Sequence, residues 1–352
     1  LLLLLPAIPW PVAVVHLASW IQSVAFFDAG LLARPECFAD TDDQGVKKLI
    51  RFVASHAGFW LALLVFGAGW GLMQPFSKIA VEGGFQPFGI MVWQGVITLV
   101  LAGALASRMG PPKGRAQWTF CAQVAVLGTL IPHFATYTAV GHLPAGLMAI
   151  VMALIPILAL LLGAALGREP VTPLRIMGVA LGLLAIAIIA ATRGQVGAGP
   201  LWAVAIAVVA PLCYATNSTL TSIRGMAGLH PLQAFAGAAA LFLPVAFMAA
   251  ALTGQLRGLG ADEASMAVIG TATGHTLIYA GFLALIAHSG AVFASQTAYL
   301  VTGFGVLWSM LLLGERYSPW VWAALCLMLS GVALVRPAAR PSPKSPLAPP
   351  RA

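Results

Sequence analysis

Two histidines in this sequence are each followed four residues later by a tyrosine: His133 by Tyr137, and His275 by Tyr279. A spacing of four places both side chains on one face of a helix. Imidazole titrates near pH 6.5, so a histidine can bind and release a proton at physiological pH. The two pairs are therefore candidates for proton transfer. A pair of buried histidines hydrogen-bonded to the neighbouring backbone would give the same pattern, and both interpretations stay open.

Lys78 is the one charged residue that lies clearly within a long apolar stretch. A charge inside hydrocarbon is costly, which makes such a residue a candidate for function. One interpretation is a ligand or gating contact that faces a central cavity and pairs with a substrate carboxylate. The other is a side chain whose apolar stem carries the ammonium group to the outer interface. No Asp or Glu lies within an apolar stretch, so a buried carboxylate for proton coupling is not expected.

Further polar and aromatic residues lie within the apolar stretches at helical spacing. Trp70 and Gln74 share one helix face, and Tyr214 and Ser218 repeat that spacing later in the chain. Amides and hydroxyls can orient a small zwitterion or an aromatic metabolite while rings stack on its apolar part. Helix–helix contacts and interfacial anchoring use the same residue types. The candidates for a substrate pathway are Lys78, Trp70, Gln74, Trp93, Gln94, His133, Tyr137, Tyr214, Asn217, Ser218, His275, Tyr279, Gln296 and Tyr299.

The composition indicates what kind of fold must position these residues. Of the 352 residues, 60% are hydrophobic and only 8% are charged, whereas a soluble protein carries about 25% charged residues. This predicts a polytopic membrane protein and excludes soluble classes of enzyme. The net charge of +8 comes from scattered Lys and Arg rather than from basic runs, so no nucleic-acid partner is expected. The four cysteines have no metal-type spacing, and neither a metal nor a cofactor is predicted.

Ten apolar stretches are long enough to cross a bilayer, which takes about 20 helical residues. The predicted fold class is therefore an all-α integral membrane protein with ten transmembrane helices. The stretches are 58–81, 86–107, 117–140, 144–166, 174–192, 200–220, 231–252, 264–286, 290–313 and 319–335.

The Lys and Arg residues predict the orientation of these helices. With residue 57 on the inside, the inner segments hold 13 Lys and Arg, whereas the outer loops hold three, namely Arg193, Arg257 and Arg316. Such a bias predicts that both termini are cytoplasmic, in the inner membrane of a bacterium. Residues 1–45 are interpreted as translated upstream sequence rather than as a signal or an extra span, since no basic region precedes their apolar part.

The sequence aligns with itself at an offset near 145, and each half then contains five spans. Five is an odd number, so the second half must enter the membrane inverted relative to the first, as in many secondary transporters. Glu169 and Glu315 recur at equivalent helix ends, where we expect them to cap or tie neighbouring loops. The predicted domains are an N-terminal extension at 1–57, two inverted five-helix repeats at 58–198 and 199–335, and a disordered cytoplasmic tail at 336–352.

Three stretches carry a resemblance to a known family: FGAGWGLMQPFSKIAVEGG at 66–84, and the longer apolar segments at 146–189 and 294–335. In the last two, a helix ends in Leu-Gly with a Glu one or two residues later, as in Leu166-Gly167-Arg168-Glu169 and Leu313-Gly314-Glu315, and a Pro and a Gly-rich helix follow. The sequence resembles the drug/metabolite transporter superfamily, in particular its EamA-type ten-helix exporters. Many relatives carry a basic residue where this chain has Trp93 and Gln94, so a substrate carboxylate contact at that position does not transfer.

The favoured function is a secondary transporter that exports small metabolites, such as amino acids, or drug-like compounds by alternating access. An integral-membrane enzyme would need paired carboxylates, a His/Asp cluster or a metal triad, and the sequence has none. A non-transporting scaffold or sensor would not require polar residues repeated within the spans of both halves. The expected partners are a small-molecule substrate, the lipid bilayer and a proton as candidate coupling ion, and a homodimer is left open.

Overall fold

The computed structural model describes residues 56–191, 199–289 and 297–335. The predictions for the N-terminal extension before residue 56 and for the tail at 336–352 lie outside these residues, as does Gln296. The described chain consists of helices and contains no strand. Its α-helices are α3 (His56–Glu82), α4 (Pro87–Leu105), α5 (Gly114–Ala125), α6 (Ile131–Val140), α7 (Ala145–Met152), α8 (Ile155–Ala165), α9 (Pro173–Ala191), α10 (Leu201–Arg224), α11 (Pro231–Leu252), α12 (Glu263–Ser289), α14 (Thr297–Leu313) and α15 (Pro319–Leu334).

Seven helical segments of the described chain are long and apolar enough to cross a membrane. Two more apolar helices, α14 and α15, are shorter, and α12 has 27 residues. The prediction of an all-helical protein with many apolar helices is thus confirmed. The seven segments are Trp60–Glu82, Pro87–Leu105, Gly114–Val140, Ala145–Ala165, Pro173–Ala191, Leu201–Arg224 and Pro231–Leu252.

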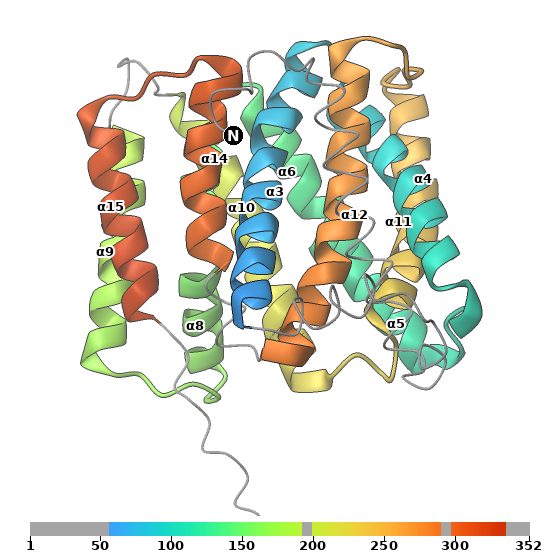
Figure 1. The fold of residues 1–352 in the computed structure, drawn as a ribbon, viewed down its shortest axis with the longest axis horizontal. Coiled ribbons are helices and arrows are strands. Elements are labelled where there is room, and N and C mark those ends of the chain that lie inside the picture. Colours follow the sequence, from blue (N-terminus) through green and yellow to red (C-terminus); the bar gives the residue numbers. More distant parts are fainter. Residues whose placement is uncertain (1–55, 192–198, 290–296, 336–352) are drawn as a thin grey trace, which may run out of the picture.

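The helices stand side by side, and their connections lie at two ends of the bundle (Figure 1). We call the end with residues 83–86, 141–144, 253–262 and 314–318 the top end, as drawn in Figure 1. The bottom end holds residues 106–113, 166–172 and 225–230.

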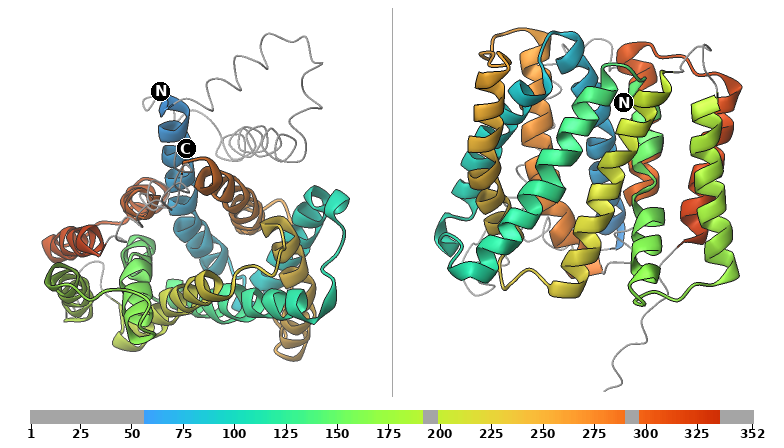
Figure 2. Two further views of the ribbon diagram at one scale, coloured as in Figure 1. Left: turned by 90° about the horizontal axis from the view of Figure 1, so that it is seen from below. Right: turned by 180° about the vertical axis from the view of Figure 1, so that it is seen from behind.

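The main contacts join helices that are far apart in the sequence. Helix α3 packs against α12 and α14, whereas α10 packs against α6, α7 and α8. The pairs α4 with α11, α9 with α15 and α7 with α14 complete the bundle, as Figure 2 shows from below and behind. Glycines let two of these pairs approach closely, because a Cβ atom on Gly178 would lie 2.7 Å from the carbonyl oxygen of Gly331, and one on Gly71 would lie 2.8 Å from the nitrogen of Gly305.

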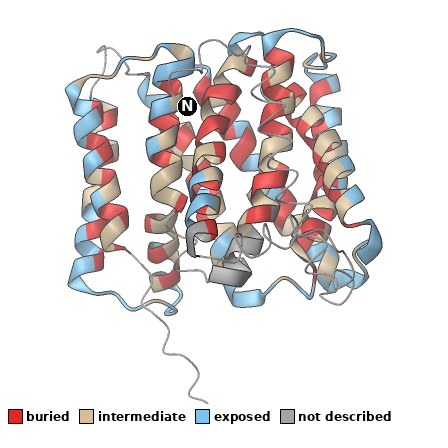
Figure 3. Cartoon of the chain, viewed as in Figure 1, coloured by how far each residue is buried: buried red, intermediate tan, exposed pale blue. Residues whose placement is uncertain are grey.

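Two large hydrophobic clusters fill the bundle. One is centred on α3, α4, α11 and α12, and the other on α7, α8, α10 and α15. Figure 3 shows buried residues on the faces that helices turn toward each other. Large apolar side chains such as Ile176 and Leu183 on α9 and Met248 on α11 are exposed. A helix that is apolar on its outer face is suited to contact lipid.

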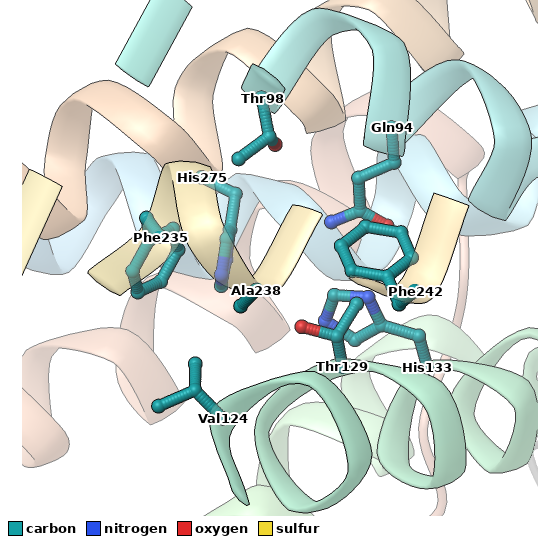
Figure 4. Close-up of a pocket in the computed structure, with 9 residues that line it drawn as sticks. All are labelled: Gln94, Thr98, Val124, Thr129, His133, Phe235, Ala238, Phe242 and His275. Atoms are coloured by element: carbon teal, nitrogen blue, oxygen red, sulfur yellow. The ribbon is translucent and has the colours of Figure 1, made fainter. Parts of the chain in front are cut away.

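One transmembrane segment contains a local irregularity. Between α5 and α6 the chain forms a π-helical turn at Val126–Leu130, and Pro132 follows at the start of α6. Proline has no backbone N–H to donate, so the helix cannot continue with its normal hydrogen bonds there. Turns of this kind are frequent at functional sites. Here the turn positions Thr129 and His133 toward the middle of the bundle (Figure 4).

Candidate functional site

A small cavity lies between α4, α5, α6, α11 and α12, and we call it the central cavity. Its polar side chains come from α4, from the π-helical turn with α6, and from α12, whereas α11 supplies apolar ones (Figure 4). The lining residues are Gln94, Thr98, Val124, Thr129, His133, Phe235, Ala238, Phe242 and His275.

His133 and His275 meet at this cavity. Their ring centroids are 5.5 Å apart, and the ring planes are nearly perpendicular at 86°. His133 is 6% exposed. His133 on α6 is thus buried, whereas His275 on α12 is half-buried.

Tyrosines surround the two imidazoles. The ring of His133 lies 5.8 Å from that of Tyr137 and 6.4 Å from that of Tyr214. His275 lies 6.4 Å from Tyr279, so each histidine contacts the tyrosine that follows it by four residues. The predicted helical face is confirmed for both pairs.

The hydrogen bonds of the cavity leave several polar groups available. The Tyr137 hydroxyl donates to Gln94 Oε1 at 2.8 Å, which leaves the Gln94 amide nitrogen as a donor. The hydroxyls of Thr98 and Thr276 bond to each other at 3.0 Å. His133 Nδ1 is buried and has no partner among the described residues. An unpaired buried nitrogen is costly, so we expect water or a ligand to bind it.

Aromatic rings form one wall around this polar centre. Trp70 on α3 lies with its ring 4.9 Å from that of Phe282 and 6.4 Å from that of Tyr279. Phe235 of α11 contacts Tyr279 at 4.3 Å. A flat apolar group of a ligand could stack against such rings.

The central cavity is nearly filled by its own side chains. Its volume is about 10 Å³, which is enough for about one water molecule. Pockets that hold small molecules measure about 300–1,000 Å³. A ligand of that size can enter only if the helices around the cavity move apart.

The cavity carries no fixed charge. Its lining residues include neither Asp, Glu, Lys nor Arg, so the two histidines are the only ionisable side chains among them. Across the described chain, no group of three or more His, Cys, Asp and Glu residues could hold a metal ion.

The histidine pattern recurs over more residues than the sequence analysis recognised. Both copies read Gly-Thr-x-x-x-His-x-x-x-Tyr, so the first Thr, the His and the Tyr follow one another at intervals of four. The offset of 142 residues that relates His133 to His275 also relates the Gly and Thr positions, which were not predicted. The residues are Gly128, Thr129, His133 and Tyr137 in one copy, and Gly270, Thr271, His275 and Tyr279 in the other.

The structure brings together six of the fourteen predicted pathway residues. Those that line the central cavity or contact the residues that line it are Gln94, His133, Tyr137, Tyr214, His275 and Tyr279. Trp70 lies one contact further out, against Tyr279. Phe235 and Phe242 of α11 also line it. They could not be recognised from the sequence, because apolar residues fill that helix.

The other predicted residues have different surroundings. The Trp93 indole donates to the carbonyl oxygen of Arg257 at 2.7 Å. Asn217 accepts a hydrogen bond from Gln123 at 3.0 Å. Ser218 is exposed and donates to its own helix. Tyr299 packs against the cluster of α7, α8, α10 and α15.

Gln74 and Lys78 continue the helix face of Trp70 toward the top end. The Gln74 side-chain oxygen is buried without a partner in the described structure. Lys78 Nζ donates to the carbonyl oxygens of Val140 at 3.2 Å and Leu143 at 3.1 Å, and it pairs with Glu82 at 3.0 Å. Lys78 therefore satisfies free carbonyls at the end of α6. Its ammonium group is directed neither into the central cavity nor simply to solvent.

Two glutamates act at helix ends as expected. Glu315 accepts hydrogen bonds from the backbone nitrogens of Ala145 at 2.8 Å and Gly146 at 3.2 Å, which caps the start of α7. Burial and the hydrogen bond to Glu315 raise the pKa of the Tyr317 hydroxyl, so it remains protonated and donates to Glu315. Glu169 pairs with Arg175 at 3.0 Å.

Arg257 joins several segments at the top end. Its guanidinium donates to the carbonyl oxygen of Gly83 at 2.5 Å and pairs with Asp262 at 2.7 Å. It also lies 4.3 Å from the centre of the Phe85 ring. The connection between α11 and α12 is thereby fixed over the turn between α3 and α4, and we call these interactions the Arg257 contact.

One protein-family model matches the first part of this chain. Residues 57–191 match the EamA-like transporter family, which belongs to the drug/metabolite transporter superfamily. The resemblance seen in the sequence is confirmed over that range, which is less than half of the chain. The apolar helices of the described residues are those of a multi-pass membrane protein, and the match to a transporter family covers residues 57–191.

The fold is also similar to a known structure. A solved chain described only as "Crystal structure of protein" is 16% identical, with a TM-score of 0.51, and the alignment covers 80% of this chain and 98% of that chain. At this identity the likeness shows a shared fold alone. No curated protein matches this chain.

Proposed function

We propose that this protein is a secondary transporter that exports small metabolites, such as amino acids, or drug-like compounds by alternating access. The observation that carries the proposal is the meeting of His133 and His275 at the central cavity, 5.5 Å apart, on helices from different halves of the chain. The match of residues 57–191 to a transporter family supports a transporter rather than an enzyme.

Ten membrane spans in two inverted repeats account for the packing. The spans would be the seven candidates together with α12, α14 and α15. Each span of the first repeat can be matched to the corresponding span of the second, the first to the sixth and so on. The contact of α3 with α12 then corresponds to the contact of α10 with α6. In the same way, the contact of α3 with α14 corresponds to the contacts of α10 with α7 and α8. The pairs α4 with α11, α7 with α14 and α9 with α15 then map onto themselves. A two-fold axis in the membrane plane would produce this pattern, and the two histidines would meet on it.

The charged residues support an orientation with the bottom end in the cytoplasm and both termini inside, in a bacterial inner membrane. The described bottom end carries Arg108, Lys113, Arg115, Arg168, Arg175 and Arg224. Among the described residues, the top connections hold Arg257 and Arg316 as their only Lys or Arg, and four of the five acidic residues lie in these connections or at the adjoining helix ends: Glu82, Asp262, Glu263 and Glu315. The domain boundaries would be 58–198 and 199–335 for the two repeats.

The substrate that fits this site is small, carries no uncompensated charge and has a flat apolar part. Polar contacts would come from the Gln94 amide, the Thr129 hydroxyl and the imidazoles, and the rings of Trp70 and Phe235 would stack on the apolar part. A zwitterionic amino acid or a neutral aromatic metabolite meets these conditions.

A proton shared by the two imidazoles provides the coupling. Two positive charges 5.5 Å apart in the protein interior would repel each other strongly, so the pair would hold at most one proton at a time. The groups around the pair are neutral tyrosines and phenylalanines. Proton entry from the top end and release at the bottom end would drive export of substrate in the opposite direction.

The test is transport by the full chain in proteoliposomes, screened with labelled amino acids and nucleosides with and without an imposed pH gradient. We expect accumulation of at least one compound that depends on the gradient and is lost in His133→Ala and His275→Ala. Ser222→Ala is the control, because this exposed hydroxyl bonds only to its own helix. Accumulation that ignores the gradient would contradict proton coupling, and no flux of any compound would contradict transport.

A further inference from the structure

A second and larger cavity opens at the bottom end of the bundle. We call it the bottom cavity, and its volume is about 490 Å³, within the range of about 300–1,000 Å³ typical of ligand sites. It lies between the first turns of α5, the end of α10 and the connection to α11. The lining residues are Arg115, Ala116, Thr119, Phe120, Gln123, Arg224, Gly225 and Ala227.

Glutamines on α5 hold the walls of this cavity in place. Gln117 donates to the carbonyl oxygen of Ala227 at 3.2 Å and accepts from the backbone nitrogen of Lys113 at 2.6 Å. Six residues further along, Gln123 donates to Asn217 at 3.0 Å and to Thr221 at 3.2 Å. These bonds join α5 to α10 and to the following connection, so the cavity has fixed sides.

Two arginines line the cavity. Neither the Arg115 nor the Arg224 guanidinium has a hydrogen-bond or ion-pair partner in the part of the chain that the structure describes, and no lining residue is acidic. Glu169, the acidic residue of the described bottom connections, pairs with Arg175. Guanidinium groups bind phosphate through paired hydrogen bonds.

The position of the cavity matches the level of lipid headgroups. Trp118, on the same turn of α5 as Arg115, is 38% exposed, and exposed tryptophans are enriched at the membrane–water interface. Phe120 and Ala116 give the cavity an apolar wall beside its charged groups. Basic pockets between helices at the cytoplasmic face are suited to anionic lipid headgroups.

We infer that the bottom cavity binds a phosphate group through Arg115 and Arg224. The same chemistry is presented by the phosphodiester of an anionic phospholipid and by a soluble phosphate compound. This site is separate from the central cavity, and its occupancy does not depend on the proposed transport.

The test measures the thermal unfolding midpoint of the full chain, purified in a neutral detergent, with four probes. These are phosphatidylglycerol, phosphatidylcholine, glycerol 3-phosphate and inorganic phosphate. We expect phosphatidylglycerol to raise the midpoint and phosphatidylcholine, whose headgroup is neutral overall, to have little effect. Arg115→Gln and Arg224→Gln should each weaken phosphatidylglycerol binding on the order of tenfold, because each removes a charge-assisted contact.

Arg108→Gln is the matched control, since it removes one positive charge from the same end without lining the cavity. An equal rise with glycerol 3-phosphate or inorganic phosphate would support the phosphate site and identify a soluble ligand. No rise in the wild-type protein with any phosphate compound would overturn the inference. Equal losses in Arg108→Gln and Arg115→Gln would overturn it as well, because general surface charge would then explain the binding. If a glutamine variant does not fold, Arg115→Lys replaces it, with a smaller loss expected.

Discussion

The top and bottom ends of the bundle use their positive charges differently. At the top end, Lys78 binds two backbone carbonyls and Glu82, and Arg257 binds Gly83 and Asp262. At the bottom end, Arg115 and Arg224 line a cavity of about 490 Å³ without a partner in the described residues. The top end is thus held by ion pairs and hydrogen bonds of its own cations. At the bottom end Arg175 pairs with Glu169, but Arg115 and Arg224 lack a counterion among the described residues.

Among the variants that test this difference between the two ends, Lys78→Met is expected to change the stability most. The substitution keeps an apolar stem but leaves the carbonyls of Val140 and Leu143 without their donor. We expect a loss of about 1–3 kcal/mol in the free energy of unfolding, because buried carbonyls lose a charged partner. Thermal unfolding in detergent measures it. An unchanged midpoint would mean that these bonds do not hold the top end.

A somewhat smaller effect is expected from Arg257→Ala, which removes the Arg257 contact. The exposed ion pair contributes little, so most of the loss, about 1–2 kcal/mol, comes from the bond to Gly83 and the Phe85 ring. Backbone hydrogen exchange in 83–88 and 253–262 should become faster. Arg316→Ala, an exposed arginine at the same end, should leave exchange there unchanged. Equal exchange rates in Arg257→Ala and Arg316→Ala would contradict the role of the Arg257 contact.

At the bottom end, adding a negative charge should stabilise the protein. Thr119→Glu places a carboxylate on the exposed face of α5, one turn after Arg115 and in the cavity with Arg224. We expect a gain of about 0.3–1 kcal/mol from the new ion pair. Thr119→Gln has the same size without the charge and serves as the control in thermal unfolding. A loss of stability relative to that control would show that the arginines already have a counterion.

The smallest expected effect is the pH dependence of stability that comes from the top end. Asp262 accepts a hydrogen bond from Ser265, and this bond lowers the pKa of Asp262. The nearby Arg257 also lowers it. A carboxyl whose pKa is lowered by folding adds stability above its unfolded pKa of about 3.9 and loses it as the pH falls through the folded pKa. The difference in unfolding midpoint between the wild type and Asp262→Asn should therefore stay constant from pH 7 to about pH 4 and shrink below that. A difference that changes near pH 6 would point to another group.

Much of the helix arrangement could be predicted because proline marks where helices begin. Pro87, Pro173, Pro231 and Pro319 start α4, α9, α11 and α15, within a residue of the predicted bounds. Proline fits the first helical turn, where its missing N–H has no partner to lose. The apolar length of each stretch then predicted the rest of the helix.

The candidate site could be predicted only in part. The histidines and their tyrosines were found because their spacing of four recurs in both halves. Trp93 and Asn217 were also predicted, but they lie toward opposite ends of the bundle, because a residue type does not show its depth or its neighbour. Thr129 was missed although it precedes His133 by one helical turn, and extending the repeat by that turn would have found it.

The central claim is that His133 and His275 act as one proton-binding unit within the substrate pathway. The most direct measurement is the initial rate of gradient-driven transport in proteoliposomes for His133→Gln, His275→Gln and the double variant. Residues that act as a unit are not additive, so we predict that either single variant loses as much gradient-driven transport as the double variant. Two partial losses that multiply in the double variant, or full coupling in either single variant, would contradict the account.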